Sequence, residues 1–226
     1  MELIVQFIDI VLHLDQHLGA WVVQYGIWIY AILFFIVFAE TGFVVTPFLP
    51  GDSLLFVAGA IAAISTAEPE GGMHIGWLLT TLCTAAILGN TVNYHIGRFI
   101  GPKVFQWENS RFFNKSALLK THAFYERHGG KTLVISRFLP IFRTFAPFVA
   151  GVGAMSYGRF QMFNFAGGLG WCFSLTLAGY WFGNLPWVKK NLSLLIVAII
   201  LVSLLPVLIA WLMRDKEQAE EKGTGS

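Results

Sequence analysis

The sequence predicts an all-α polytopic membrane protein with an internal inverted repeat. Of its 226 residues, 56% are hydrophobic and 12% are charged, which is about half the charged fraction of a typical soluble domain. The apolar residues gather in runs long enough to cross a bilayer. Two of these runs, 40–63 and 132–154, contain both prolines and charges. We therefore expect about four transmembrane helices and two opposed re-entrant helical hairpins.

The N-terminal part predicts an interfacial helix followed by a first span. Residues 1–19 alternate apolar pairs with acidic and histidine residues, which is typical of an amphipathic helix lying at the membrane surface. Residues 20–39 form the first long apolar run, with aromatic residues near its start, and this run ends on Glu40.

The segment 40–63 is too broken for one straight span and too apolar for an aqueous loop. A re-entrant helix–turn–helix fits it better. The breaking residues lie in its first half, with the tip expected near 47–51: Gly42, Pro47, Pro50, Gly51 and Asp52.

A second span is expected at 75–97, followed by a polar stretch at 98–131. Seven basic residues lie in that stretch, so the positive-inside rule makes it a cytoplasmic loop. We expect an amphipathic surface helix within it. The second hairpin follows at 132–154, with Pro140 and Pro147 as its helix breakers.

Two further spans, at about 160–182 and 191–213, complete the predicted membrane domain, which covers 20–213. The tail 214–226 is polar. With the basic loop inside, the N-terminus and the C-terminus are both cytoplasmic. The predicted location is the bacterial inner membrane.

An internal repeat supports two opposed halves. The sequence Phe-Val-Ala-Gly at 56–59 recurs at 148–151, and each copy follows a proline-broken stretch. The long span after each copy ends on paired glycines: Gly97 and Gly101, then Gly179 and Gly183. An inverted repeat would place a binding site where the hairpin tips meet. Chance repetition of small and apolar residues is the alternative.

Four charged residues in the broken segments are the candidate site. Arg137 and Arg143 carry forks that match phosphate oxygens, so we expect them to bind an anionic head group. Removal from water disfavours the charged form of a carboxylate, so Glu40 and Asp52 are candidates for proton coupling or gating. The alternative is that the four charges pair as two salt bridges that only hold the hairpins together.

Other polar residues are weaker candidates for the site. Asn90, Asn93 and Tyr94 are candidates for a polar lining, although hydrogen bonding between helices is their ordinary role. No metal-ligand spacing, hydrolase motif or phosphate-cradling loop is present. We therefore expect no enzyme activity, no metal and no cofactor other than protons as the coupling ion. The expected partners are lipids and a second copy of the chain, with no nucleic acid.

Over residues 1–213 the chain resembles the DedA family of bacterial inner-membrane proteins, also called the SNARE-associated or VTT-domain group. Four motifs carry this resemblance. They are Phe-Ala-Glu-Thr-Gly at 38–42, Pro-Phe-Leu-Pro-Gly-Asp-Ser at 47–53, Asn-Tyr-His-Ile-Gly-Arg at 93–98 and the arginine–proline stretch 136–151.

The resemblance implies opposed re-entrant hairpins, lipid movement across the bilayer and dependence on the proton motive force. The substrates that it implies are undecaprenyl phosphate, the recycled carrier of envelope glycans, and phospholipids such as phosphatidylethanolamine. The acidic pair of the family corresponds to Glu40 and Asp52, and its arginines to Arg137 and Arg143. One departure is Asn90, where similar sequences often carry an aspartate after the glycine equivalent to Gly89.

Our interpretation is a flippase-like transporter that returns undecaprenyl phosphate across the inner membrane. A phospholipid flippase is one alternative. Two others come from different classes: a proton-coupled antiporter of small ions or drugs, and a membrane scaffold that acts through partners.

Overall fold

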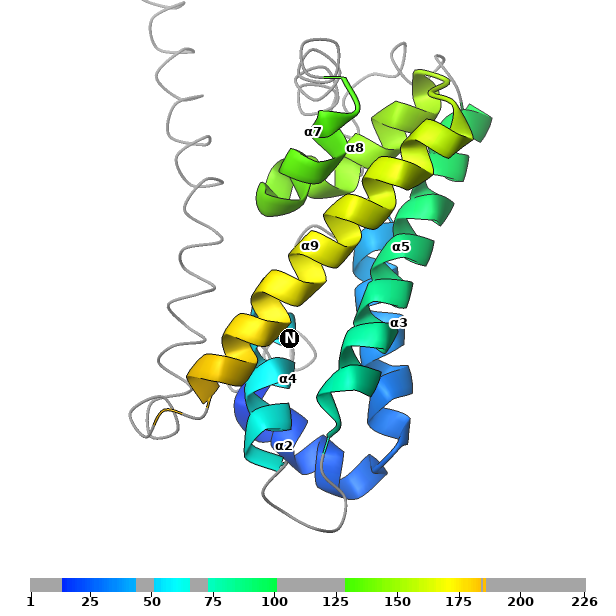
Figure 1. Ribbon diagram of the computed structural model, residues 1–226. Helices are drawn as coiled ribbons and strands as arrows, with labels where there is room; N and C mark the ends of the chain where they lie inside the picture. The colour runs from blue at the N-terminus through cyan, green and yellow to red at the C-terminus, as the bar shows by residue number, and fades with distance from the viewer. Residues whose placement is uncertain (1–13, 44–50, 66–72, 101–128, 184, 186–226) are drawn as a thin grey trace, which may run out of the picture.

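The computed structural model describes residues 14–43, 51–65, 73–100, 129–183 and 185, and in these ranges the regular structure is entirely helical (Figure 1). The predicted all-α class is confirmed for this part of the chain. The elements are α2 (Leu14–Tyr25), α3 (Trp28–Gly42), α4 (Gly51–Ser65), α5 (Ile75–Ile100), α7 (Lys131–Ile135), the 3-10 turn η2 (Ser136–Phe138), α8 (Pro140–Val152) and α9 (Tyr157–Gly183).

The two long helices agree with two of the predicted spans. Helix α5 contains the predicted span 75–97 and continues to Ile100, and α9 contains the span 160–182. Within the described residues, α5 is the one helix that is both long enough and apolar enough to cross a membrane. The predicted span 191–213, the tail 214–226 and most of the segments 1–19 and 98–131 lie outside the described residues.

The first predicted span, 20–39, is wrong as a single helix. The chain is interrupted at Gly26, whose φ of +51° is a left-handed conformation that favours glycine. One helix therefore ends at Tyr25 and the next begins at Trp28. Hydropathy alone could not show this break, because glycine does not interrupt an apolar run.

Pro147 is also wrong as a helix breaker. Helix α8 begins at Pro140, where a missing N–H costs nothing, and then runs through Pro147 to Val152. Residues 143–152 are buried, so packing on both sides holds the helix together at the one position where Pro147 removes a backbone hydrogen bond.

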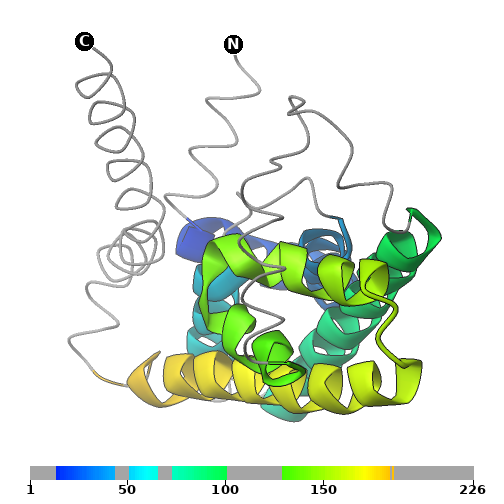
Figure 2. The same cartoon turned by 90° about the horizontal axis from the view of Figure 1, so that it is seen from above.

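The short helices lie in two segments of the chain, one in each half of the repeat. Helix α3 ends and α4 begins on either side of residues 44–50, while α7, η2 and α8 follow one another directly. Helix α4 lies toward one end of the molecule, and α7 and α8 lie toward the other (Figure 1). Seen from above, α8 and α9 run along opposite sides, and α5 meets the C-terminal end of α8 (Figure 2).

The internal repeat reappears as two equivalent sets of glycine contacts. A Cβ at Gly59 on α4 would overlap the backbone oxygen of Thr176 on α9. A Cβ at Gly179 on α9 would overlap the backbone oxygen of Phe56 on α4. In the other half, a Cβ at Gly151 on α8 would overlap the backbone oxygen of Tyr94 on α5. A Cβ at Gly97 on α5 would likewise overlap the backbone oxygen of Phe148 on α8. The contact residues are those of the sequence repeat.

Each half therefore packs its short helix against the long helix of the other half. Close backbone approach through small residues is the usual way in which helices associate in membranes, where apolar side chains gain little by leaving lipid. The exchange between halves brings the hairpin ends together near the centre, where the charged side chains lie.

Candidate functional site

Three helix ends meet around Glu40. This carboxylate lies in the last turn of α3 and is completely buried. The backbone N–H of Gly51, the first residue of α4, donates a hydrogen bond to its Oε1 at 3.2 Å. A Cβ at Gly51 would overlap the carboxylate of Glu40, so a larger residue at this position would have to displace that side chain. Glu40 therefore joins the end of α3 to the start of α4 directly.

The third helix end contributes Arg143, which lies in the first turn of α8 and is 4% exposed. Its Nη2 contacts Oε1 of Glu40, and its Nη1 donates to Oδ1 of Asp52 at 2.8 Å. One guanidinium thus holds two carboxylates, and the fork geometry of arginine is suited to this. We call Glu40, Asp52 and Arg143 the charged triad.

Trp171 of α9 completes the surroundings of the triad. Its Nε1 donates to the same Asp52 Oδ1 at 2.9 Å, and its ring centroid lies 5.1 Å from Cζ of Arg143. The indole therefore stabilises both charges, one by a hydrogen bond and the other by a cation–π contact. The triad depends on four helices: α3, α4, α8 and α9.

Arg137 has a different environment. It lies in η2 and is 2% exposed. Its Nη2 donates to Asn164 Oδ1 at 2.7 Å and to the backbone oxygen of Asn164 at 3.3 Å. In the part of the chain that the structure describes, no carboxylate forms an ion pair with it. The alternative considered from the sequence, in which the four charges pair as two salt bridges, therefore holds for Glu40, Asp52 and Arg143 but not for Arg137.

The predicted polar lining divides into two parts. Asn90 donates to Asn164 at 3.2 Å and thus lies beside the partner of Arg137. Asn93 donates to the backbone oxygens of Thr41 and Thr144 at 3.2 and 2.8 Å, so it connects the two hairpins. Tyr94 instead stacks on Phe160, donates to the backbone oxygen of Met155 and accepts a hydrogen bond from Arg98 at 2.8 Å.

Several buried polar atoms around the hairpin ends have no hydrogen-bond partner. Six of the seven such atoms among the described residues belong to this region: Glu40 Oε2, Asn90 Oδ1, Asn93 Oδ1, Arg137 Nε, Arg143 Nε and Thr144 Oγ1. Because buried polar groups are normally paired, such a concentration marks a place that can receive a polar ligand or water. The arrangement offers cationic donors, neutral amide and hydroxyl groups, and one carboxylate oxygen.

The structure describes only some of the remaining predicted residues. Gly51 and Pro140 begin α4 and α8, whereas Pro47 and Pro50 lie outside the described residues. Sequence reasoning missed Asn164 and Trp171. A polar residue inside an apolar span is a usable signal for Asn164; an aromatic residue in such a span is too common to indicate Trp171. No group of three potential metal ligands occurs among the described residues.

Comparison with known proteins agrees with these features. The VTT domain matches residues 49–181, which include α4, α5, α8 and most of α9. The chain belongs to the DedA family. It is 54% identical over 219 residues to Protein DedA of Escherichia coli K12, covering 97% of this chain and 98% of that protein. The resemblance inferred from the motifs is confirmed.

More distant members of the DedA family are also similar. An uncharacterized membrane protein of Mycobacterium tuberculosis H37Rv is 46% identical over 175 residues, which cover 77% of this chain and 75% of that protein. Inner membrane protein YqjA of Escherichia coli K12 is 36% identical over 162 residues, covering 70% and 69%. No solved structure matches the chain. These relatives show that this DedA-family chain is a membrane protein.

Proposed function

We propose that this DedA-family protein moves undecaprenyl phosphate across the bacterial inner membrane, driven by the proton motive force. The observation that carries the proposal is the unequal state of two buried arginines at the hairpin ends. Arg143 is held by two carboxylates, while Arg137 is held by an amide and has no acidic partner among the residues that the structure describes.

The first step of the proposed cycle is binding of the phosphate. Arg137 attracts the anion because no described carboxylate neutralises its guanidinium. Asn164 is the hydrogen-bond partner of Arg137, and Asn90 lies close enough to Asn164 to contribute an amide. A phosphate monoester matches a guanidinium fork better than it matches an ammonium group. The polyprenyl chain remains in the surrounding lipid.

The charged triad supplies the coupling in this proposal. The phosphate competes with Glu40 and Asp52 for Arg143, because one guanidinium cannot donate fully to three anions. Protonation of a carboxylate weakens its hold on Arg143 and frees the arginine for the phosphate. Loss of that proton restores the triad and expels the phosphate. Proton transfer and head-group movement are thereby linked.

The direction of transport and the orientation of the termini belong to the same proposal. Both termini are proposed to be cytoplasmic, so that the basic stretch 98–131 faces the cytoplasm. Return of the carrier then runs from the outer to the inner leaflet, in the direction of inward proton flow.

Leaflet exchange in proteoliposomes tests the proposal. Undecaprenyl phosphate, phosphatidylethanolamine and a small cation are supplied in separate vesicles, each with an imposed proton gradient. The expected result is protein-dependent exchange of undecaprenyl phosphate that Arg143→Ala abolishes. Exchange of phosphatidylethanolamine alone would move the assignment to a phospholipid flippase. Proton-linked cation flux without lipid exchange would indicate an antiporter, and no transport at all by folded protein would favour a scaffold.

A further inference from the structure

A chain of hydrogen-bonded side chains leads from Arg137 to the surface of the protein. Asn164, which is 1% exposed, accepts from Arg137 and donates to Gln161 Oε1 at 3.1 Å. Gln161 Nε2 in turn donates to the phenol oxygen of Tyr157 at 2.7 Å. Tyr157 is 47% exposed. We call Asn164, Gln161 and Tyr157 the polar track.

Helix α5 lines the same track from the other side. Thr91 Oγ1 accepts from Gln161 at 2.9 Å and from Asn164 at 3.3 Å, and Asn90 joins at Asn164. Hydrogen bonds between helices are an ordinary way to hold α5 and α9 together. Such bonds do not require a continuous path to the surface, nor an unpartnered buried acceptor such as Asn90 Oδ1 beside that path.

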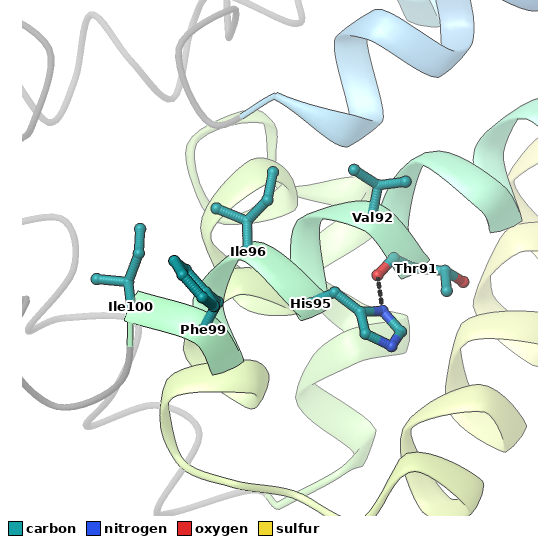
Figure 3. Close-up of a pocket in the computed structure, with 6 residues that line it drawn as sticks. All are labelled: Thr91, Val92, His95, Ile96, Phe99 and Ile100. Atoms are coloured by element: carbon teal, nitrogen blue, oxygen red, sulfur yellow. Dashed lines mark hydrogen bonds between the residues drawn. The ribbon is translucent and has the colours of Figure 1, made fainter.

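An apolar groove begins where the polar track reaches the surface. Its volume is about 580 Å³, and it is lined by Thr91, Val92, His95, Ile96, Phe99 and Ile100 of α5. Figure 3 shows the four apolar side chains along one side of the helix, with Thr91 and His95 at its edge. Thr91 lines the groove and also accepts hydrogen bonds from the polar track, and the ring centroid of His95 lies 5.5 Å from that of Tyr157.

The charges around this junction favour an anion. Helices α5 and α9 contain no acidic residue. Arg98 and Arg159 are both exposed and lie on the same helices close to the outer end of the track. The junction therefore combines an apolar groove, neutral hydrogen-bonding groups and nearby positive charge. A surface that binds a lipid with one apolar chain and an anionic head group needs these three features.

We propose that the junction of α5 and α9 is a lateral docking site for a lipid that carries a phosphate monoester. Its chain lies in the groove of Val92, Ile96, Phe99 and Ile100, and its phosphate lies at Tyr157, Gln161 and Thr91. The polar track connects this phosphate position with Arg137. This inference rests on the proposed function, since it identifies the side on which the substrate leaves Arg137. The groove ends at Ile100, within the basic stretch 98–131 that is proposed to face the cytoplasm, and therefore lies on the inner-leaflet side.

Photolabelling tests the docking site separately from transport. Proteoliposomes receive a polyprenyl phosphate with a photoactivatable diazirine in its chain, and labelled residues are located by mass spectrometry. The neutral polyprenol with the same diazirine is the control lipid. The expected result is labelling of residues 92–100 by the phosphate that exceeds labelling by the alcohol by about tenfold. Equal labelling by both lipids, or labelling spread over all lipid-facing helices, would overturn the site.

Two variants with matched controls sharpen the test. Val92→Trp fills the groove, whereas Leu88→Trp places the same bulk one turn earlier on α5, at an exposed residue outside the groove. Gln161→Leu interrupts the track at nearly constant volume, whereas Met162→Leu changes the next, exposed residue. Val92→Trp is expected to remove the labelling, and its control to retain it.

Gln161→Leu is expected to retain labelling of the groove but to slow exchange about tenfold, as loss of hydrogen bonds to a charged group would. Exchange by Gln161→Leu or Val92→Trp at the rate of the wild type would overturn the proposed route. Groove labelling without exchange by the wild type would support the docking site and contradict the transporter. Exchange with labelling elsewhere would contradict only the docking site.

Discussion

Arg143 holds Glu40 with one guanidinium nitrogen and Asp52 with the other, although the acids lie 103 and 91 residues from it in the sequence. This contact connects the end of α3, the start of α4 and the start of α8. It makes the two hairpins one unit, and any molecule that draws Arg143 away must also loosen their connection. The stability of the fold and the state of the site are therefore linked.

Replacement of Arg143 by alanine should destabilise the protein strongly. It leaves the completely buried Glu40 without its cationic partner, and removing one member of a buried ion pair costs about 3–5 kcal/mol. The measurement is thermal unfolding in detergent micelles. The control is Arg159→Ala, which removes the same side chain from an exposed position on α9. Equal melting temperatures of the two variants would contradict a structural role for the charged triad.

Asn164→Asp should abolish transport while the protein remains folded. The substitution is nearly isosteric and places a carboxylate about 2.7 Å from Arg137, so that this arginine acquires an acidic partner, which it does not have within the described ranges. If Arg137 binds the substrate phosphate, its affinity for that phosphate must fall. Undecaprenyl phosphate exchange and thermal unfolding are measured on the same preparation. Unchanged exchange by stable protein would argue against Arg137 as the phosphate-binding residue.

Gly59→Ala and Gly151→Ala should each destabilise the protein by about 1–3 kcal/mol, the typical cost of overpacking. In both cases the added methyl group meets a backbone oxygen of the facing helix, which cannot move aside as a side chain can. Because the two contacts are equivalent in the repeat, the two losses should be similar. Unfolding of the purified variants in detergent gives the comparison.

The control for these glycines is Gly170→Ala on α9. A Cβ there would meet nothing within 4 Å, and the residue is exposed. Since alanine is the better helix former by up to about 1 kcal/mol, this variant should be neutral or slightly more stable. Destabilisation of all three variants to the same degree would remove the argument from close packing.

Trp171→Phe should weaken the triad without breaking it. The ring beneath Arg143 is retained, but the hydrogen bond from Nε1 to Asp52 is lost. A hydrogen bond to a charged group contributes about 1.5–3 kcal/mol, and the partly exposed position of Asp52 reduces that figure. We expect a small drop in melting temperature and a clear change in proton-driven exchange. Exchange identical to the wild type would indicate that Asp52 does not require Trp171.

The sequence was a good guide to residue types and a poor guide to their partners. Glu40, Asp52, Arg137 and Arg143 stand out because charges are rare in apolar segments. Their pairing could not be read in the same way, because either arginine could reach either acid in an unfolded chain. The distances decide that Arg143 takes both acids and Asn164 takes Arg137.

The sequence likewise predicted some helix boundaries and not others. Runs of apolar residues predict α5 and α9, because the length of an apolar run reflects the thickness of the bilayer. The break at Gly26 and the continuation of α8 through Pro147 depend on neighbouring packing and on one backbone conformation. Hydropathy does not report either of these.

By itself, the sequence determined that this chain is a helical membrane protein of the DedA family with charges kept inside two broken segments. Apolar length, motif spacing and the cost of a charge in lipid are all local properties of the chain. Only the tertiary structure decided how the halves exchange their short helices, which arginine is neutralised, and where Asn164 and Trp171 enter the site. Those outcomes depend on which surfaces meet, because contacts between residues a hundred positions apart are selected by packing and charge in the folded protein.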